Sequence, residues 1–342
     1  MTLPTRKLGS TDIELTTLGF GGASVGNLYK AITDDQASAT IHAALNTGIR
    51  YFDTAPHYGQ GLSEQRLGNA LHSFNQNIVL STKVGRVLHP IVPPPKGTER
   101  LGFIDGLPYE PVFDYSHDGV MRSFESSLRR LQVNKVDILL AHDLGKMTHG
   151  DEHLRHWKDF MNGGYRAMRE LKDQGRVRAI GLGVNEWQIC ADVLRHTDVD
   201  VFLLAGRYTL LEQQPLDEFL PECVRRKVSI ILGGPFNSGI LIDGVRGGAV
   251  PYYNYEPAPP AIIERVKAIQ AICDSYSVPM AAAALAFPLA HPAVVSVIPG
   301  QASVEQVNAV HQWFNTPVPA SLWSDLRSAG LLHEHAPVPS VT

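Results

Sequence analysis

Apolar positions follow two alternating patterns along this chain. Residues 34–48 place apolar side chains on one face at helical spacing, and Gly48 ends the segment as a usual helix stop. The next segment, residues 49–53, is a short apolar run of the kind that forms a buried strand. The alternation of helical periods with short apolar runs then continues towards the C-terminus.

This alternation predicts eight strands and eight helices. The strands are expected at residues 18–21, 49–53, 77–83, 136–142, 177–185, 199–206, 228–234 and 293–300. The helices are expected at residues 34–48, 62–74, 117–131, 165–175, 187–196, 216–226, 259–276 and 303–314. Before the first strand, alternating residues on both sides of Gly9 and Ser10 predict a β-hairpin.

Repeated strand–helix units predict an α/β fold in which helices cover a parallel sheet. Eight such units close into a (β/α)8 TIM barrel, here a single domain over residues 1–342 with the hairpin at its N-terminus. A doubly wound open sheet is the alternative. Its dinucleotide-binding motif is missing, because GLGVNE at 181–186 lacks the third glycine and follows the fifth strand, not the first. A barrel is therefore the better interpretation.

Three connections are longer than a barrel requires, namely residues 85–117, 143–163 and 235–260. Each one follows a strand, so all three lie on the face formed by the carboxyl ends of the strands. Long ordered loops on that face usually build a binding pocket. We expect these loops to form the substrate pocket; the simpler interpretation is that they are insertions without a role.

Composition excludes several functional classes. The chain is 44% hydrophobic and 19% charged, as in ordinary globular proteins. A net charge of −4 without clustered Lys or Arg argues against a nucleic-acid partner. The three cysteines are far apart and form no C-x-x-C, which suits reduced thiols in a cytoplasm. We expect no membrane partner, since the longest apolar run, residues 280–287, is too short to span a bilayer. The oligomeric state stays open.

Polar residues stand at the ends of four consecutive predicted strands. Asp53, Lys83, His142 and Asn185 end the second to fifth strands, and Tyr58 follows Asp53 in a loop. Consecutive strand ends adjoin in a barrel, so these side chains are expected to converge. Asp53 and Lys83 alone would equally suit a structural ion pair, but Tyr58 and His142 beside them favour a catalytic site.

The chemistry of these groups suggests proton transfer at oxygen. A phenol has a pKa near ~10, and the ammonium of Lys83 is expected to lower it until Tyr58 can exchange a proton. Asp53 would hold Lys83 in place, and a neutral His142 would orient a substrate oxygen. Such a site protonates a carbonyl or deprotonates an alcohol. Because no nucleophile or metal set is evident, a nicotinamide cofactor is expected to exchange the hydride.

The histidines of the second long loop raise the alternative of a metal site. His149, His153 and His156 have helix-like spacing, but no carboxylate or cysteine completes a recognisable ligand set. A solvated loop is the commoner explanation, and no metal is expected.

Five motifs in chain order together resemble the aldo-keto reductase family. They are DTAPHYG (53–59), STKVG (81–85), LLAHD (139–143), GLGVNE (181–186) and VIPGQASVEQV (297–307). The resemblance covers most of the chain and maps the family's catalytic tetrad onto Asp53, Tyr58, Lys83 and His142. The pattern is most similar to bacterial aldose dehydrogenases, a subgroup that includes L-fucose or D-threo-aldose dehydrogenases and the related pyridoxal 4-dehydrogenases.

The resemblance implies oxidation of an aldose at C1 to the lactone, with a sugar or aldehyde as the small-molecule substrate. Three alternatives remain within the family: pyridoxal oxidation, general NADPH-dependent aldehyde reduction, and a non-catalytic nucleotide-sensing subunit. A metal-dependent barrel hydrolase would need H-x-H on the first strand, where this chain has GFGG at 19–22.

The resemblance also implies where the cofactor binds. Asn185 matches the position that holds the nicotinamide carboxamide. Members that prefer the phosphorylated cofactor carry Lys and Arg after the eighth strand, where this chain has Gly300 and Gln306, so NAD is expected, with NADP as the alternative. Gly233 replaces the tyrosine that often stacks on the nicotinamide. The expected cofactor-binding residues are Gly21, Gly22, Asp53, Asn185, Gly233, Pro235, Gly300 and Gln306.

Overall fold

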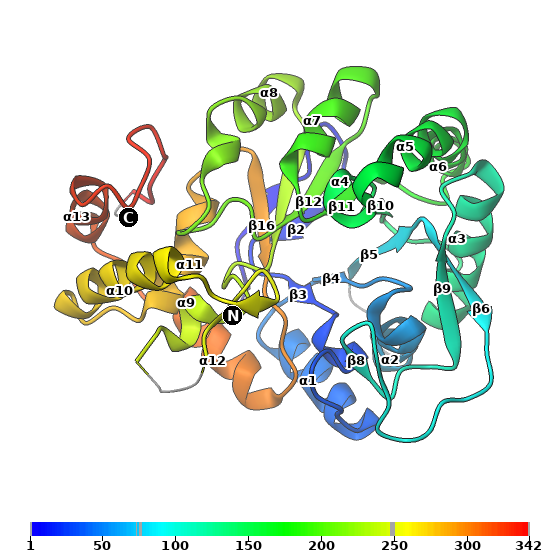
Figure 1. The fold of residues 1–342 in the computed structure, drawn as a ribbon, viewed down its shortest axis with the longest axis horizontal. Helices are drawn as coiled ribbons and strands as arrows, with labels where there is room; N and C mark the ends of the chain where they lie inside the picture. Colours follow the sequence, from blue (N-terminus) through cyan, green and yellow to red (C-terminus); the bar gives the residue numbers. More distant parts are fainter. Residues whose placement is uncertain (1, 73, 75–76, 247–249, 341–342) are drawn as a thin grey trace.

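The chain folds into a barrel of parallel strands surrounded by helices (Figure 1). The computed structural model describes residues 2–72, 74, 77–246 and 250–340. The barrel strands are β3 (Phe20–Gly21), β4 (Tyr51–Asp53), β5 (Val79–Val84), β10 (Ile138–His142), β11 (Ala179–Val184), β12 (Val201–Ala205), β13 (Ser229–Gly233) and β16 (Val294–Ile298). They pair in the order β16-β13-β12-β11-β10-β5-β4-β3. Parallel bridges from Leu18 to Val297 and from Gly21 to Gly300 join the first strand to the last. The predicted (β/α)8 barrel is confirmed.

Helices cover the outside of the strands. They are α1 (Asp34–Asn46), α2 (Leu62–Leu71), α3 (His117–Leu131), α6 (Tyr165–Asp173), α7 (Trp187–His196), α8 (Phe219–Arg226), α10 (Pro260–Ser275), α11 (Met280–Leu289), α12 (Val304–Phe314) and α13 (Ala320–Ser328). Side-chain oxygens of Thr33, Ser116 and Ser303 accept backbone N–H groups at the starts of α1, α3 and α12. These caps satisfy amides that have no partner within the helix, and so determine where each helix begins.

Sequence periodicity did not reveal α11, which packs against β16 and α12. Its sequence, MAAAALAFPL, is almost uniformly apolar and mostly buried, so it has no polar face to produce a helical period. The predicted helix at 259–276 is α10, which packs on α11 and α13.

The N-terminal hairpin closes one end of the barrel. It consists of β1 (Thr5–Lys7) and β2 (Glu14–Thr16), paired antiparallel, as the alternating pattern predicted. Leu8, Ile13 and Leu15 form one buried cluster with inward-facing strand residues, including Ile138 and Val201. The opposite end of the barrel, where the strands terminate, therefore remains for a binding site.

The three long connections contain regular structure. Residues 85–117 form two antiparallel pairs, β6 (Arg86–Pro90) with β9 (Tyr109–Phe113) and β7 (Glu99–Arg100) with β8 (Phe103–Ile104). Residues 235–260 contain α9 (Ile240–Asp243), β14 (Tyr252–Tyr253) and β15 (Glu256–Pro257), and positions 247–249 lie outside the described residues. Short 3-10 turns occur elsewhere: η1 (Ser24–Gly26), η2 (Tyr58–Gly61) and η5 (Gln214–Leu216).

Residues 143–163 are mostly helical, and the helix expected to start at 165 starts earlier. The segment contains α4 (Lys146–His149), η3 (Gly150–Glu152), α5 (His153–Asp159) and the π-helical turn η4 (Phe160–Gly164), which runs directly into α6. The prediction ended the long connection at Gly163 and began the helix at residue 165. Packing of η4 against α3 keeps this segment helical, because tertiary contacts override local propensity.

All three cysteines, Cys190, Cys223 and Cys273, are buried and unpaired. Within the described residues, no single helix has the length and apolar character of a membrane span. Only α10 and α11 taken together would pass by length and composition, and the chain bends by 100° between them.

Candidate active site

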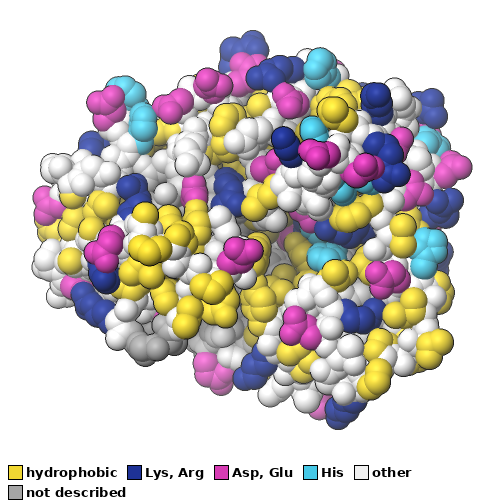
Figure 2. Space-filling view, in the orientation of Figure 1, with side chains coloured by type: hydrophobic (Ala, Val, Ile, Leu, Met, Phe, Trp, Pro, Cys, Tyr) yellow, Lys and Arg dark blue, Asp and Glu magenta, His cyan; other side chains and the backbone are white. Residues whose placement is uncertain are grey.

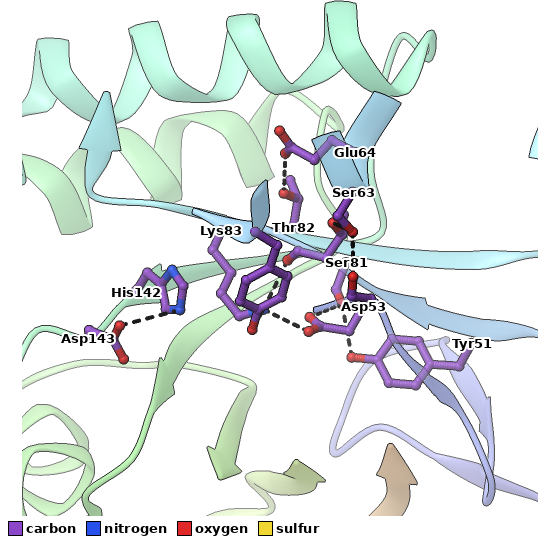
Figure 3. Close-up of polar contacts among 12 residues, drawn as sticks. Tyr51, Asp53, Ser63, Glu64, Ser81, Thr82, Lys83, His142 and Asp143 are labelled. Atoms are coloured by element: carbon purple, nitrogen blue, oxygen red, sulfur yellow. Dashed lines mark hydrogen bonds and ion pairs between the residues drawn. The ribbon is translucent and has the colours of Figure 1, made fainter. Parts of the chain in front are cut away.

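The structure brings Asp53, Lys83 and His142 together at the carboxyl end of the barrel (Figure 3), and Tyr58 lies beside Lys83 and His142. Asp53 is the last residue of β4, Lys83 is the fifth of the six residues of β5, and His142 is the last of β10. Tyr58 begins η2, five residues after Asp53. Asn185 follows β11 and lines the same cavity.

The Lys83 ammonium is the centre of this group. Its Nζ donates to Asp53 Oδ2 at 2.7 Å, to the Thr54 carbonyl at 2.9 Å and to the Tyr58 hydroxyl at 3.1 Å. Lys83 is only 1% exposed, so its charge depends on these three acceptors. Each of its three protons has a partner, which fixes the orientation of both Asp53 and Tyr58.

A second set of hydrogen bonds holds Asp53 from behind. Ser81 Oγ donates to Asp53 Oδ1 at 2.7 Å, and the Tyr51 hydroxyl lies 3.0 Å from Ser81 Oγ. Sequence reasoning missed Ser81, although a signal existed. It stands two residues before Lys83 on the same strand, so both side chains face the barrel interior.

Burial and pairing act in opposite directions on the Asp53–Lys83 pair. Burial raises the pKa of the Asp53 carboxyl, and Lys83 and Ser81 only partly offset that effect. Burial acts to lower the pKa of Lys83, but the charge of Asp53, together with Tyr58, outweighs it and raises the pKa. Lys83 therefore remains an ammonium, held by a partner that is itself held by Ser81.

Burial raises the pKa of Tyr58 to about 12, against the opposing effect of Lys83. The sequence-based expectation was therefore wrong in its net direction. The ammonium acts as expected, but the loss of water around the phenol is the larger effect. Tyr58 is a proton donor at neutral pH in this structure.

His142 is a neutral imidazole. Burial lowers its pKa well below 6.5, and the nearby cations Arg86 and Lys83 add to the effect. Its ring lies edge-on to Tyr58 with centroids 5.8 Å apart. Its Nδ1 is buried without a hydrogen-bond partner, and its Nε2 is 3.5 Å from Asp143 Oδ2.

A cavity of about 460 Å³ opens over these groups, in the hollow visible in Figure 2. Tyr58, Lys83, His142 and Asn185 line it, and each long connection contributes to its wall. The contributions of the long connections are Glu99, Leu101, Gly102 and Phe103 from the first, Asp143 from the second and Tyr255 from the third.

Sequence reasoning missed His57, which lines the cavity beside Tyr58. Its ring packs edge-on against Phe103 at 5.3 Å and against His142 at 5.9 Å. Burial lowers the pKa of His57 to about 3, and Arg86 and Lys83 contribute. Its place in the motif DTAPHYG, between Asp53 and Tyr58, was the available signal.

The glycines expected to approach the cofactor are first required by the barrel itself. A Cβ on Gly21 would lie 2.9 Å from the Ile298 carbonyl oxygen, and one on Gly22 would lie 2.5 Å from the Asp53 carbonyl oxygen. Only glycine permits this contact between neighbouring strands. Neither residue lines the cavity described above.

The remaining expected cofactor residues lie at neighbouring strand ends outside the cavity lining. Gly233 ends β13 and pairs with Ala205, and Pro235 is buried two residues later. Gly300 follows β16 and bridges to the first strand. Gln306 lies in the first turn of α12, where its Oε1 accepts the Ala302 N–H at 2.7 Å.

The histidines of the second long connection lie behind the site. His149 and His156 stack with ring centroids 4.0 Å apart, and His149 Nε2 is 3.0 Å from the Tyr115 hydroxyl. His153 is near the surface, where its Nδ1 is 2.9 Å from the Gly150 carbonyl. Across the described ranges, no group of three or more His, Cys, Asp or Glu side chains is arranged to hold a metal.

A sequence model of the aldo/keto reductase family matches residues 17–330. The chain belongs to this family. It is 45% identical to a pyridoxal 4-dehydrogenase from Microbacterium luteolum over 335 residues, which cover 96% of this chain and 97% of that protein. It is 36% identical to a D-threo-aldose 1-dehydrogenase from a Pseudomonas species over 328 residues, which cover 94% of this chain and 95% of that protein.

The solved structure of an aldo-keto reductase from Bacillus halodurans in its holo form has the same fold. The TM-score is 0.74 with 26% sequence identity, over 98% of this chain and 99% of that one. This protein is therefore an oxidoreductase, and its family works with nicotinamide cofactors.

The strand ends of this aldo/keto reductase fit such a cofactor. Gln301, three residues after the end of β16, is fully buried, and both its Nε2 and its Oε1 lack a hydrogen-bond partner. A buried amide without partners is costly unless a ligand satisfies it. Gly183 and Ala205, which have little or no side chain, line the cavity together with Asn185.

Proposed function

We propose that Asp53, Tyr58, Lys83 and His142 form the catalytic tetrad of an NAD-dependent dehydrogenase that oxidises a cyclic hemiacetal to a lactone. The observation that carries the proposal is the Lys83 ammonium, which donates to both Asp53 and Tyr58 on the floor of the cavity. This arrangement positions a phenol for proton exchange with a substrate hydroxyl.

In the proposed reaction, Tyr58 first releases its own proton to solvent, and the resulting phenolate takes the proton of the hemiacetal hydroxyl as the hemiacetal carbon loses a hydride. The bound nicotinamide supplies the hydride acceptor. Lys83 lowers the pKa of Tyr58 from the higher value that burial alone would give, so that the phenolate becomes accessible. His142, being neutral, donates a hydrogen bond to the substrate oxygen without adding charge. The product gains a C=O bond in place of its C–H and O–H bonds.

Two substrate classes fit this reaction. Pyridoxal closes its aldehyde on the neighbouring hydroxymethyl group, and the 45% identical relative bears its name. The aromatic and apolar wall formed by Tyr29, Leu101 and Phe103 suits its flat ring. Aldoses are the second class, supported by the D-threo-aldose relative and by polar groups at Asp143 and Asn185 that can bind sugar hydroxyls.

The cofactor is proposed to be NAD because Gly300 and Gln306 offer no cation to a 2′-phosphate. The side-chain oxygen of Gln306 is moreover engaged by the Ala302 N–H. General NADPH-dependent aldehyde reduction is disfavoured by the same residues.

The test is to follow reduced-nicotinamide absorbance with NAD or NADP against pyridoxal and a panel of aldoses. Tyr58→Phe is expected to lower kcat by about 10²–10⁴-fold, the usual contribution of a positioned acid–base group. Tyr252→Phe, which alters a half-exposed tyrosine outside the cavity, serves as the matched control. If no hemiacetal reduces either cofactor, or if Tyr58→Phe retains turnover, the proposed function is wrong. A preference for NADP would overturn the cofactor assignment alone.

A further inference from the structure

Asp143 has no role in the proton transfer proposed above, yet its side chain lines the same cavity. It directly follows His142, and its backbone adopts φ +50. Residues other than glycine seldom take that conformation, and when they do, the strain often serves a function. Its N–H donates to the Gly183 carbonyl at 3.0 Å, which holds the strained backbone in place.

Arg86 fixes the charge and orientation of the Asp143 carboxylate. Arg86 Nη2 donates to Asp143 Oδ2 at 2.8 Å. The guanidinium itself is immobilised, because it is 7% exposed and stacks 4.5 Å over the ring of Phe113. Tyr115 holds the backbone on the other side, donating to the carbonyls of His142 at 2.6 Å and Asp143 at 3.1 Å. The carboxylate is therefore preorganised before any substrate arrives.

An Arg86–Asp143 ion pair with a purely structural role would not need its carboxylate to line the cavity. The known side-chain partners of Asp143 within the described residues, Arg86 and His142, both approach Oδ2. The carboxylate lies beside the cavity together with Tyr58 and His142. A carboxylate only accepts hydrogen bonds, so its place in the wall selects for a donor on the ligand.

His142 and Asp143 present complementary groups to a substrate. His142 Nε2 faces Asp143 Oδ2 at 3.5 Å while its Nδ1 is buried. The facing carboxylate favours the tautomer with the proton on Nε2, because an N–H beside a carboxylate is stabilised. A substrate oxygen can then accept a hydrogen bond from the Nε2–H of His142. A neighbouring donor group of the same substrate can donate a hydrogen bond to the carboxylate of Asp143.

We propose that Asp143, held by Arg86, is a substrate-binding residue that accepts a hydrogen bond from a donor group of the substrate. The proposal rests on the dehydrogenase function above. In an aldose the donor is the hydroxyl beside the reacting carbon, and in pyridoxal it is the ring hydroxyl on the carbon next to the one that bears the aldehyde. An anionic group at this position is repelled.

The test compares each substrate with an analogue that lacks the donor, in the wild type and in Asp143→Asn. The pairs are an aldose with its 2-deoxy form, and pyridoxal with 2-(hydroxymethyl)benzaldehyde. Asp143→Asn is expected to lower kcat/KM for the full substrate by about 10- to 100-fold, mainly through KM, as for a lost hydrogen bond to a charged group. The analogue is expected to lose little further, because the contact is already absent.

Asp137→Asn is the matched control. Asp137 lies just before the opposite end of β10 and pairs with Arg178 at 2.8 Å, so this variant also removes one carboxylate from an Asp–Arg pair. It is expected to leave the ratio between substrate and analogue unchanged.

The outcomes are distinguishable. If the wild type oxidises a substrate but Asp143→Asn lowers substrate and analogue equally, or lowers neither, the role assigned to Asp143 is wrong. A wild type that oxidises no hemiacetal overturns the proposed function, and the assignment with it. The ratio of kcat/KM for the substrate to kcat/KM for the analogue is measured within each variant, so a smaller fraction of folded protein affects both values equally. Asp143→Ser provides a second variant, which controls for any effect of the asparagine on the position of Arg86.

Discussion

At the scale of single residues, one buried ammonium organises the site. Lys83 bonds to Asp53, Thr54 and Tyr58 at 2.7–3.1 Å. The sequence already indicated the Asp53–Lys83 pair, because both residues stand at the ends of neighbouring predicted strands. It could not indicate the size of the desolvation effect on Tyr58, which depends on how completely loops distant in sequence exclude water.

Lys83→Met is expected to shift the limb of the kcat/KM pH profile that reports Tyr58 towards higher pH. Lys83 opposes the burial that raises the pKa of Tyr58, so its removal lets that pKa rise further, and turnover near neutral pH falls by about 10²–10⁴-fold. The measurement is kcat/KM against pH with the substrate found above. Lys172→Met, which removes an ammonium bonded to Asp200, is expected to leave the profile in place, and an unmoved limb in Lys83→Met would contradict the role given to this ammonium.

At the scale of elements, the first long connection supports the site through Tyr115. This tyrosine binds the carbonyls of His142 and Asp143, and its ring lies against Gly85, the residue after β5. Gly85 has φ +101, and a Cβ there would lie 2.4 Å from Tyr115 Cε1. A single backbone position thus links two strand ends.

Gly85→Ala is expected to lower both stability and activity, because it strains the backbone and displaces Tyr115. Gly97→Ala is the matched control, since Gly97 also has positive φ (+83) but open space around its Cβ. The control isolates the backbone strain, roughly 1 kcal/mol, and is expected to keep its kcat. Urea unfolding and kcat/KM are measured for both variants; equal losses in the two would show that the Tyr115 contact has no part in the effect.

Element boundaries depended on tertiary contacts in several places. The uniformly apolar α11 had no period to detect, and the helical run from His153 to Asp173 begins within residues 143–163, which were predicted as a connection. In both cases packing against neighbouring elements, α12 and β16 for the first and α3 for the second, decides the local conformation.

At the scale of the whole molecule, buried neutral histidines couple stability to pH. Burial lowers the pKa of His291 to about 4 and that of His57 to about 3. The unfolded chain binds protons below its pKa near 6.5, whereas the folded chain does not until the lower pKa is reached. The contribution of these histidines to the free energy of unfolding is therefore fully present above pH 6.5, and it decreases as the pH falls towards 4.

His291→Gln is expected to reduce this acid-side loss. His291 is 5% exposed, and its lowered pKa corresponds to up to about 3 kcal/mol of stability lost between pH 7 and 4. The free energy of unfolding in urea is measured at several pH values in that range. His117→Gln is the contrasting control, because hydrogen bonds from the His117 ring to Glu170 and Asp118 raise the pKa of His117, so its stabilisation is present at low pH and lost on raising the pH. An unchanged acid slope in His291→Gln would contradict the assignment.

The sequence by itself determined the barrel and the residues at its strand ends. Alternation of helical and strand periods is a local property, and eight repeats of it have few ways to bury their apolar faces. The order of strands therefore placed Asp53, Lys83 and His142 side by side before any coordinates were known.

Only the tertiary structure decided the wall of the cavity and the charges within it. Asp143, Arg86, His57 and Phe103 come from connections without a repeating pattern, and their positions follow from long-range packing. The pKa of Tyr58 likewise follows from burial, which is a property of the assembled barrel. Local periodicity specifies the scaffold, whereas desolvation and contacts between distant segments specify the chemistry of the site.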